Sequence, residues 1–417
     1  MSKRIKHWGV IFLSFVLVSC SIPISQPTAT LPLPVTIHQS TPTTVVPTAV
    51  VTPTVFSQRS PLTIPIVNLA NIPISSVGFN LEVVAQGLFV PWSIVFTSPD
   101  RILVSERNGY IREIVAGKLN PKPLIYFQSV ATVDETGLLG LDLDPDYSVN
   151  HILYACYTTL KNGLFFNRVV KLQDLGTSIQ ELGIIIDNIP AGHYHAGGRI
   201  RFGPDGKLYI TSGDALQKDL AQDVNSLAGK ILRINSDGSF PVDNPFKNSP
   251  VFTYGNRNSE GLDWSPQNGL LIETEHGPTG FDGPPGGDEI NIIQPGANYG
   301  WPLVSHTQTA SGLTPPLVDF TPAVAPASAM FYRSTLFPTF TNSFIFGGLE
   351  GQGIFRVVFA PDNPAVISQV EKLNLSVGRV RDVVEGPDGS IYFTTSNRDG
   401  RGQVQPGDDK IYRLTQK

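Results

Sequence analysis

One repeated pattern constrains the fold of this chain more than any other: a turn rich in Pro, Asp and Gly, followed by a short strand of alternating side chains. The clearest copies have their turns at residues 203–206 and 386–389. In such turns, proline presets the backbone dihedral of the second position, and glycine supplies the left-handed residue before the next strand. The strands that follow occupy residues 102–105, 152–155, 208–211, 270–273 and 391–394, and a degenerate sixth copy occupies 343–348.

Six copies at unequal intervals of roughly 40 to 80 residues predict an all-β chain, and in particular a six-bladed β-propeller. Glycine (39) and proline (35) are abundant, and helical periodicity is scarce. The alternative is a pair of β-sandwiches, which requires more even strand lengths and a change of composition near the middle of the chain. The sequence has no such change. We therefore predict one propeller domain over residues 66–417, since about 350 residues exceed a usual single core and favour a repetitive architecture.

The residues before this domain predict export and a tether. Residues 1–19 have a basic head and an apolar stretch at 10–18 that is too short to span a bilayer. The residues before Cys20 resemble the lipobox of bacterial lipoproteins, which implies a signal peptide over 1–19 and acylation of Cys20; an ordinary secretory signal with a chance cysteine is the alternative. Residues 20–65 are rich in Pro, Thr and Ser, which favours an extended linker. We expect an extracytoplasmic domain, at the periplasm or cell surface, held to the cell membrane or outer membrane by its lipid anchor alone.

The net charge, the hydropathy and the cysteine content argue against a nucleic-acid partner, a further membrane-spanning helix and an intrachain disulfide. The net charge of −5 argues against a nucleic-acid partner. No apolar run after residue 20 is long enough to cross a membrane as a helix. The chain has 2 cysteines, so acylation of Cys20 would leave Cys156 without an intrachain disulfide partner.

A histidine in a glycine-rich run is the first candidate for chemistry. Residues 191–199 read Ala-Gly-His-Tyr-His-Ala-Gly-Gly-Arg and precede a predicted strand, and the strand after it ends at Asp214. Neighbouring strand ends of a propeller lie side by side, so Asp214 would hold one ring nitrogen of His195 and leave the other free as a base. The alternatives are a satisfied surface or core histidine and an aspartate that caps a turn.

The stretch from Tyr254 to Pro302 is dense in Gly, Pro, Asn and acidic residues. Its carbonyl and carboxylate oxygens are the ligands that Ca²⁺ prefers, and its glycines permit close approach of the backbone. A rigid surface loop is the alternative. Arg257 in this stretch joins Arg379 and Arg381, which are two residues apart on a predicted strand and so share a face. Like charges on one face are tolerated in solvent, or around an anion with several carboxylates or phosphates.

Seven runs, taken together and in order, resemble the glucose/sorbosone dehydrogenase family, and most closely its soluble aldose sugar dehydrogenases, which use pyrroloquinoline quinone. The resemblance extends over about residues 81–414 and implies a six-bladed propeller, in agreement with the repeats. It also implies a flat tricarboxylate quinone at the mouth of the channel, which explains the set of arginines. The seven runs are residues 191–199, 203–214, 227–233, 243–246, 255–261, 275–302 and 378–382.

The resemblance implies a role for each candidate residue in the oxidation of a sugar. His195 would be the general base that takes the proton from the anomeric hydroxyl, and Asp214 would orient it. Arg257 and Asn258 would contact cofactor and sugar, with Arg257 polarising the quinone oxygen as it becomes negative. Glu135 falls where the family has a Gln or Glu lining the site.

The remaining implied roles concern anion and metal binding. Arg379 and Arg381 would clamp carboxylates of the cofactor. Two calcium sites are implied: the carbonyls of Gly277 and Pro278 would bind the Ca²⁺ that holds the cofactor, and Glu289 with Tyr299 would belong to a structural Ca²⁺ site.

Two positions depart from the family pattern. Glu350 stands where relatives often have a lysine that faces the cofactor, and a carboxylate there would repel a tricarboxylate unless a cation lies between them. Tyr194 stands where relatives carry His or Asp, which concerns the sugar contacts rather than the base.

These observations lead to one main functional hypothesis and two alternatives. The main hypothesis is oxidation of aldose sugars to aldonolactones, with hydride passing from C1 to pyrroloquinoline quinone in the presence of Ca²⁺; the electron acceptor and the natural sugar stay unidentified. The first alternative is a non-catalytic propeller that binds a sugar or a partner protein. The second is a Ca²⁺-dependent lactone hydrolase, which would share the histidine and the calcium but leaves the arginines unexplained.

Overall fold

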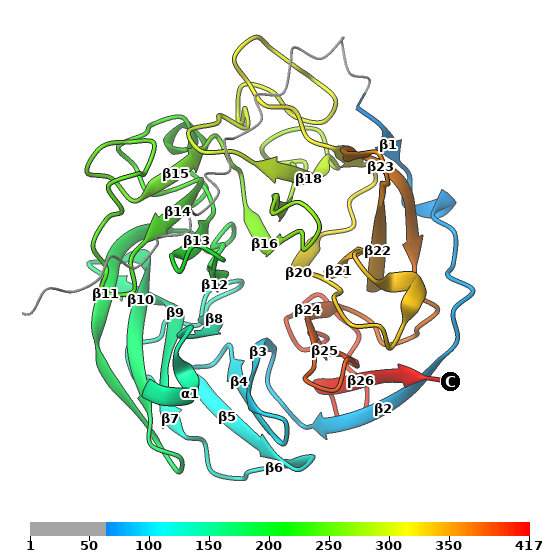
Figure 1. Ribbon diagram of the computed structural model, residues 1–417. Coiled ribbons are helices and arrows are strands. Elements are labelled where there is room, and N and C mark those ends of the chain that lie inside the picture. The colour runs from blue at the N-terminus through cyan, green and yellow to red at the C-terminus, as the bar shows by residue number, and fades with distance from the viewer. Residues whose placement is uncertain (1–63) are drawn as a thin grey trace, which may run out of the picture. The chain divides into compact units, whose positions relative to one another are not determined.

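The computed structural model describes residues 64–417, which form six β-sheets arranged as blades around a central axis (Figure 1). This confirms the predicted all-β, six-bladed propeller. The predicted signal peptide, Cys20 and the linker up to residue 63 lie outside the described residues, so these assignments stay predictions.

The blades are numbered 1 to 6 in chain order, and each runs from an inner strand at the axis to an outer strand. Blade 1 contains β3 (Pro91–Ser98), β4 (Arg101–Glu106), β5 (Tyr110–Val115) and β6 (Lys118–Leu119), with β7 (Ile125–Tyr126) paired to β5. Blade 2 contains β8 (Leu138–Leu143), β9 (Ile152–Lys161), β10 (Leu164–Asp174) and β11 (Ile179–Ala191). Blade 3 contains β12 (Ile200–Phe202), β13 (Leu208–Ser212), β14 (Lys230–Ile234) and β15 (Val251–Tyr254).

The last three blades include the strands at the start of the described chain. Blade 4 contains β16 (Ser259–Trp264), β17 (Leu271–Glu275), β18 (Asp288–Ile293), β19 (Val318–Phe320) and β1 (Ile66–Val67). Blade 5 contains β20 (Pro326–Phe331), β21 (Phe344–Gly348), β22 (Gly353–Ala360) and β23 (Asn363–Lys372). Blade 6 contains β24 (Val380–Glu385), β25 (Ile391–Thr395), β26 (Lys410–Gln416) and β2 (Phe79–Gln86). The short helices are α1 (Tyr147–Asn150), η1 (Leu69–Asn71), η2 (Lys218–Ala221) and η3 (Pro338–Phe340).

The middle strands are apolar on both faces because each blade packs against two neighbours. In β4, Ile102 and Val104 pack towards blade 6, whereas Leu103 packs towards blade 2. In β13, Ile210 packs towards blade 2 and Tyr209 towards blade 4. Six hydrophobic clusters form in this way, one between each pair of adjacent blades, so the core is a ring of interfaces.

The repeated turns connect the first and second strands of blades 1–4 and 6, and in blade 5 a longer segment with η3 takes this place. The six repeat strands are β4, β9, β13, β17, β21 and β25, the second strand of every blade. In blade 3, the Gly206 amide donates to the Gly203 carbonyl over 2.9 Å, and Gly206 has a φ of 71°, as this turn chemistry requires. The repeat therefore marks each blade once.

The two ends of the described chain close the ring in blade 6. Strand β2, near the start, pairs antiparallel with β26, near the end, from Phe79 opposite Gln416 to Gln86 opposite Lys410. The inner strand of this blade is β24, which is also the strand that Arg379 leads into.

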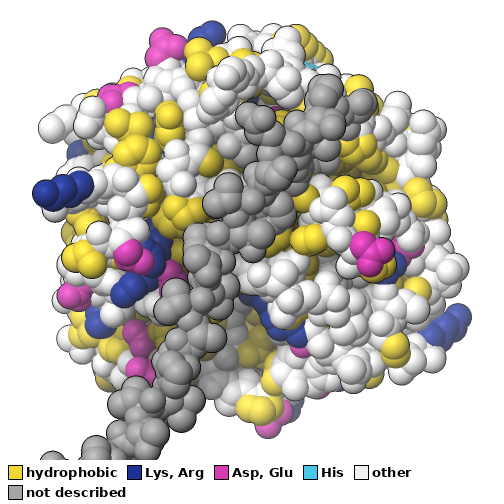
Figure 2. Space-filling model, turned by 45° about the horizontal axis from the view of Figure 1, so that its top comes forward, with side chains coloured by type: hydrophobic (Ala, Val, Ile, Leu, Met, Phe, Trp, Pro, Cys, Tyr) yellow, Lys and Arg dark blue, Asp and Glu magenta, His cyan; other side chains and the backbone are white. Residues whose placement is uncertain are grey.

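The surface carries charges of both signs. On the face turned forward in Figure 2, Lys and Arg side chains lie next to Asp and Glu among apolar and polar ones. Among residues 64–417, no helix is both long and apolar enough to span a membrane. Cys156 is buried in β9 as a free thiol, and burial raises its pKa to about 12.

Candidate active site

The predicted catalytic and cofactor-binding residues lie at one end of the central channel. His195 precedes β12 and Asp214 follows β13, and these two chain ends are neighbours because the strands are antiparallel. Arg257 and Asn258 lead into β16, and Arg379 leads into β24. The inner strands of all blades start at this end of the channel, so the residues that precede them converge from separate blades.

His195 and Asp214 form a buried pair. The His195 Nδ1 lies 2.7 Å from the Asp214 Oδ1, and His195 is 4% exposed. A carboxylate accepts hydrogen bonds only, so Nδ1 carries the hydrogen and the lone pair of Nε2 is left free. Gly213 permits this approach, because a Cβ there would lie 2.0 Å from the His195 carbonyl oxygen. The pair is therefore arranged to present Nε2 as a proton acceptor.

Trp301 joins the histidine pair to the arginine. Its indole Nε1 donates to the Asp214 Oδ2 over 2.8 Å. The guanidinium carbon of Arg257 lies 5.4 Å from the centre of the same indole ring, within cation–π range. Trp301 thus donates a hydrogen bond to the Asp214 oxygen that does not contact His195, and its ring supports Arg257.

Arg257 is held from several sides and is 2% exposed. Its Nε donates to the Asp282 Oδ2 over 2.7 Å, and its Nη1 donates to the His276 carbonyl over 3.0 Å. Its backbone amide donates to the Glu275 carboxylate. The guanidinium is therefore fixed in position before any ligand arrives.

Asn258 links the histidine loop to a buried glutamate. Its Oδ1 accepts from the Gly197 amide over 3.0 Å, and its Nδ2 donates to the Glu260 Oε1 over 3.3 Å. The other oxygen, Glu260 Oε2, lies 3.8 Å from Arg381 without a hydrogen-bond partner among the described residues. Burial raises the pKa of Glu260 to about 7, against the opposing field of Arg381.

Arg379 and Arg381 converge on one carboxylate. The Arg379 Nε donates to the Asp399 Oδ2 over 2.8 Å, and the Arg381 Nη2 lies 4.0 Å from the same oxygen. The Arg381 Nε is buried and has no partner among the described residues. Glu350, whose side chain is 68% exposed, lies 3.7 Å from the Arg379 Nη1. Glu350, the carboxylate that departs from the family pattern, thus lies next to the guanidinium of Arg379.

Two further buried arginines belong to this group. Arg199 lies 4.1 Å from the centre of the Trp92 ring and 3.2 Å from Asp382, and its Nε and Nη2 lack partners among the described residues. Arg107 is also buried with an unpartnered Nε. Burial, together with the nearby charge of Arg381, lowers the pKa of Arg107 from its ordinary value. Buried arginines with unpartnered N–H groups therefore gather at this end of the propeller.

Glu135 supports the backbone of the candidate base. Its Oε2 accepts from the His195 amide over 2.9 Å, and its Oε1 lies 3.6 Å from Arg401. The guanidinium carbon of Arg401 lies 5.0 Å from the ring centre of Tyr194, the second position that departs from the family pattern.

The loop that contains Gly277 and Pro278 is fixed by Asp288. One carboxylate oxygen of Asp288 accepts from the Gly277 amide over 2.8 Å, and the other accepts from the amides of Val324 and Ala325. A Cβ on Gly277 would lie 2.2 Å from the Gly286 carbonyl oxygen, so only glycine fits there. The Pro278 carbonyl accepts from the Gly286 amide over 3.1 Å and retains a second lone pair.

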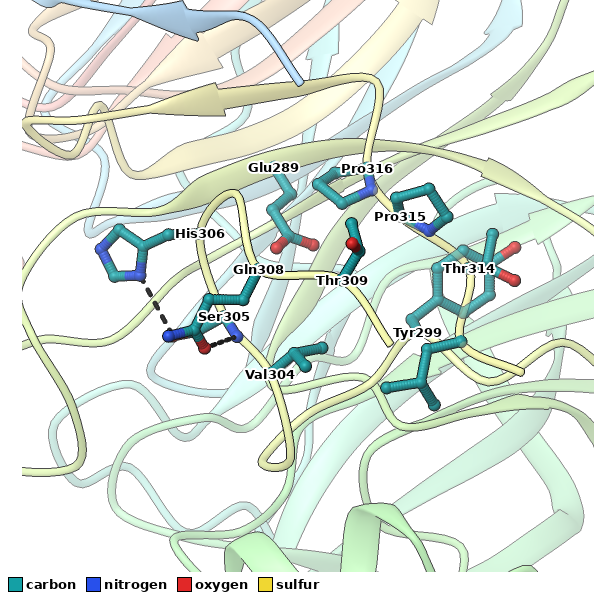
Figure 3. Close-up of a pocket in the computed structure, with 11 residues that line it drawn as sticks. Glu289, Tyr299, Val304, Ser305, His306, Gln308, Thr309, Thr314, Pro315 and Pro316 are labelled. Carbon is teal, nitrogen blue, oxygen red and sulfur yellow. Dashed lines mark hydrogen bonds between the residues drawn. The ribbon is translucent and has the colours of Figure 1, made fainter. Parts of the chain in front are cut away.

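Glu289 and Tyr299 line a separate, narrow cavity (Figure 3). Its volume is about 10 Å³, room for one water molecule or ion. The Glu289 carboxylate points towards the segment that carries Gln308 and Thr309. The Tyr299 hydroxyl donates to the Ile292 carbonyl over 2.6 Å and accepts from the Gln294 amide, so its backbone carbonyl is the oxygen left for a ligand.

Glu289, the acid that lines this cavity, has other buried acids as neighbours. Burial and the charge of Glu275 raise the pKa of both Glu273 and Glu289 well above the ordinary value. Oxygens of Glu273, Asn291 and Asp319 lack hydrogen-bond partners among the described residues. No group of three His, Cys, Asp or Glu side chains in residues 64–417 is arranged as a ready set of metal ligands, so a cation here would also need backbone carbonyls or water.

Sequence reasoning missed several residues of this site. Trp301 and Asp288 lay inside the quoted glycine-rich motifs, but nothing in the sequence tied them to Asp214 or Gly277. Arg199 ended the histidine run and was left without a role. Asp399, and Phe281, whose ring stacks on that of His195, have no recognisable signal in the sequence, because their importance comes from partners in other parts of the fold.

Comparison with solved structures gives the class of this protein. An oxidoreductase of Thermus thermophilus described as a glucose dehydrogenase is 40% identical with a TM-score of 0.74, over 81% of this chain and 100% of that one. The pyrroloquinoline-quinone-bound aldose sugar dehydrogenase of Streptomyces coelicolor is 32% identical with a TM-score of 0.71, over 81% of this chain and 98% of that one. The chain is a sugar dehydrogenase of the quinoprotein oxidoreductase class.

The particular family follows from the sequence comparisons. The chain belongs to the glucose/sorbosone dehydrogenase family, which it matches over residues 88–412. It is 30% identical to the aldose sugar dehydrogenase YliI of Escherichia coli over 351 residues, which are 77% of this chain and 91% of that protein.

Proposed function

We propose that this protein oxidises aldose sugars to aldonolactones with pyrroloquinoline quinone and Ca²⁺, and that His195 is the general base. The observation that carries the proposal is the His195–Asp214 pair, which leaves Nε2 of His195 without a hydrogen-bond partner among the described residues. At the same end of the propeller lie the fixed guanidinium of Arg257 and the unpartnered N–H groups of Arg381 and Arg107. A base beside buried hydrogen-bond donors suits loss of a proton together with growth of negative charge on a nearby oxygen.

The residues present fit an anionic, planar cofactor. Buried N–H groups without partners are costly, so those of Arg381, Arg107 and Arg199 suit a ligand that carries carboxylates. Pyrroloquinoline quinone supplies carboxylates and, when bound, would accept the two electrons of the oxidation as one hydride from C1 of the sugar. Arg379 and Arg381 would hold its carboxylates, and Arg257 with Asn258 and Glu135 would line the remaining wall.

The chain's own residues account for the movement of the proton. Nε2 of His195 would accept the proton of the anomeric hydroxyl, and Asp214 would stabilise the imidazolium through Nδ1. Asp214 would in turn be kept in place by Trp301 and by the Leu216 amide, which donates to its Oδ1 over 2.9 Å. General-base catalysis of this kind contributes about 10²–10⁴-fold to a rate.

Charge balance supports a role for Ca²⁺. Arg257, Arg379 and Arg381 already face Asp282, Asp399 and Glu260, so a tricarboxylate would bring additional negative charge. A Ca²⁺ seated on the carbonyls of Gly277 and Pro278 would offset that charge. A second Ca²⁺ in the narrow cavity, bound by Glu289 and the Tyr299 carbonyl, would offset the repulsion among the buried acids.

A quinone titration tests the proposal. Purified protein with Ca²⁺ should take up pyrroloquinoline quinone with a change in absorbance and then reduce a dye when D-glucose or another aldose is added. His195→Ala should abolish turnover and leave quinone uptake largely intact. Absent uptake by a folded protein would favour the non-catalytic alternative. Repulsion of a tricarboxylate by Glu350 would favour that alternative, but Glu350 lies 3.7 Å from the Arg379 Nη1, which offsets its charge.

We further propose that Cys20 is lipidated and holds the domain on the outside of a membrane. The support is the lipobox resemblance and the composition of residues 20–65. Expression with a radiolabelled fatty acid should label the protein, and Cys20→Ser should remove both the label and the membrane association. The electron acceptor is left open by this proposal.

A further inference from the structure

A short turn over the candidate base contacts both His195 and Arg257. Residues 279–283 form this turn, in which the Thr279 amide donates to the Asp282 Oδ1 over 3.1 Å and the Gly280 amide donates to the Gly283 carbonyl over 3.1 Å. Two internal hydrogen bonds and the following Pro284-Pro285 pair give the turn a defined shape. We call residues 279–283 the flap.

The flap is fastened to the site through Arg257. The Arg257 Nε donates to the Asp282 Oδ2 over 2.7 Å, and its Nη2 donates to the Thr279 hydroxyl over 3.4 Å. The side chains of Arg257 and Asp282 are only 2% and 10% exposed, so this ion pair is shielded from water and is stronger than a surface pair.

The flap places a phenyl ring beside the base. The rings of Phe281 and His195 are stacked, with centroids 5.9 Å apart and planes at 24°. Phe281 is nevertheless 66% exposed, whereas His195 is buried. An aromatic side chain of this size usually buries its apolar surface. Here most of that surface is left open at the mouth of a polar site.

A sugar bound at His195 would meet this surface. A hydroxyl that gives its proton to Nε2 must lie within about 3 Å of it, so the attached ring carbons lie within reach of Phe281. An aldose has a polar rim of hydroxyls and apolar C–H faces. The arginines and Asn258 suit the hydroxyl rim of the sugar. Phe281 suits one of its C–H faces, since it has the only large exposed aromatic surface in contact with His195 among the described residues.

We propose that Phe281 determines sugar affinity and preference by packing against the C–H face of the aldose bound at His195, and that Asp282 is the positioning residue that holds Phe281 there through Arg257. This inference rests on the proposed function. It requires no movement of the flap, since the ring already lies beside the base.

The test compares Phe281→Ala with the wild-type protein and with Phe240→Ala. Phe240 is a matched control, since it is 42% exposed and lies in the loop after β14, at the opposite end of the channel. With D-glucose and D-xylose as probes, Phe281→Ala should raise KM about tenfold at similar kcat, because one aromatic contact is lost. Phe281→Tyr should restore KM. Quinone uptake and the thermal unfolding midpoint should match the wild type.

A double-mutant cycle tests the part played by Asp282. Asp282→Asn should raise KM in the presence of Phe281, and should raise it clearly less in the Phe281→Ala background, because the part of its effect that acts through that ring is then absent. Asp282→Glu should restore part of the loss. Fully additive effects on KM would overturn the positioning role.

Two other outcomes overturn the role of Phe281. A KM within about twofold of wild type for both sugars would show that the ring does not contact the substrate. Weaker quinone uptake by Phe281→Ala would assign the ring to the cofactor instead. Failure of the proposed function is distinguishable from both, because the wild-type protein would then take up no quinone and oxidise no sugar.

Discussion

Trp301 and Asp214 are hydrogen-bonded over 2.8 Å, although they lie 87 residues apart in the chain. The same indole ring lies under the guanidinium of Arg257. One side chain therefore contacts both Asp214, which we propose orients the base His195, and Arg257, which we propose faces the developing negative charge.

Removing this hydrogen bond should slow turnover. Trp301→Phe keeps a ring beneath Arg257 but leaves the Asp214 Oδ2 without its donor. Hydrogen bonds to charged groups contribute about 1.5–3 kcal/mol, so kcat should fall by about ten- to a hundredfold. Trp301→Leu removes the ring as well and should weaken quinone binding, measured by absorbance titration. Unchanged kcat in Trp301→Phe would contradict this role.

Glu260 should make stability depend on pH. Its pKa is raised from 4.5 to about 7 by burial, so the folded state binds more protons than the unfolded state between these values. The contribution of Glu260 to the free energy of unfolding is therefore fully present below pH 4.5 and is lost as pH rises through 7. The slope of this loss is at most about 1.4 kcal/mol per pH unit. Glu260→Gln cannot ionise, so its stability relative to the wild type should increase between about pH 5 and pH 8. Urea denaturation of both proteins at about pH 5 and pH 8 checks this prediction. An equal difference in the free energy of unfolding at the two pH values would refute it.

Lys230 should be essential for the stability of the loop between β13 and β14, because it binds three carbonyls of that loop. It is 0% exposed, and its Nζ donates to the carbonyls of Leu220, Ala221 and Ala228 over 2.8, 3.0 and 2.6 Å. Burial lowers its pKa to about 7, yet only the ammonium form has donors for all three carbonyls. Lys230→Met leaves these carbonyls unsatisfied and should cost about 2–4 kcal/mol in the free energy of unfolding. The exposed Lys218, in the same loop, gives the control Lys218→Met, which should be neutral.

Removal of Ca²⁺ should lower the melting temperature through the cavity at Glu289. A cation there offsets the repulsion between Glu289 and the neighbouring buried acids. Ca²⁺ at about 100 times its dissociation constant stabilises the folded state by about 2.7 kcal/mol. Glu289→Gln should lose most of the Ca²⁺-dependent rise in melting temperature, whereas the exposed Glu181→Gln should retain it. An equal rise in both variants would place the cation elsewhere.

The sequence was sufficient for the fold because its signal is local. Five of the six repeats have a proline-containing turn that specifies its own geometry, and the sixth is recognisable by its strand at 343–348, so counting the repeats counted the blades. The pairing of β2 with β26 carries no such signal, since it depends on closure of the whole ring. In the site, His195 and Asp214 could be placed together because they end neighbouring strands. The contacts of Trp301 with Asp214, and of Phe281 with His195, depend on how loops from different blades pack, which no spacing in the chain encodes.

The closure of blade 6 also determines when Arg379 and Arg381, the arginines that we propose bind carboxylates of the cofactor, come into position. Arg379 and Arg381 stand at the inner strand of a sheet whose outer strand, β2, comes from the opposite end of the described chain. A nascent chain that has made the first five blades still lacks the sheet that positions both arginines and Asp399. The cofactor binding that we propose would therefore require the complete ring, and a chain cut short before β26 would lose the sheet that positions both arginines.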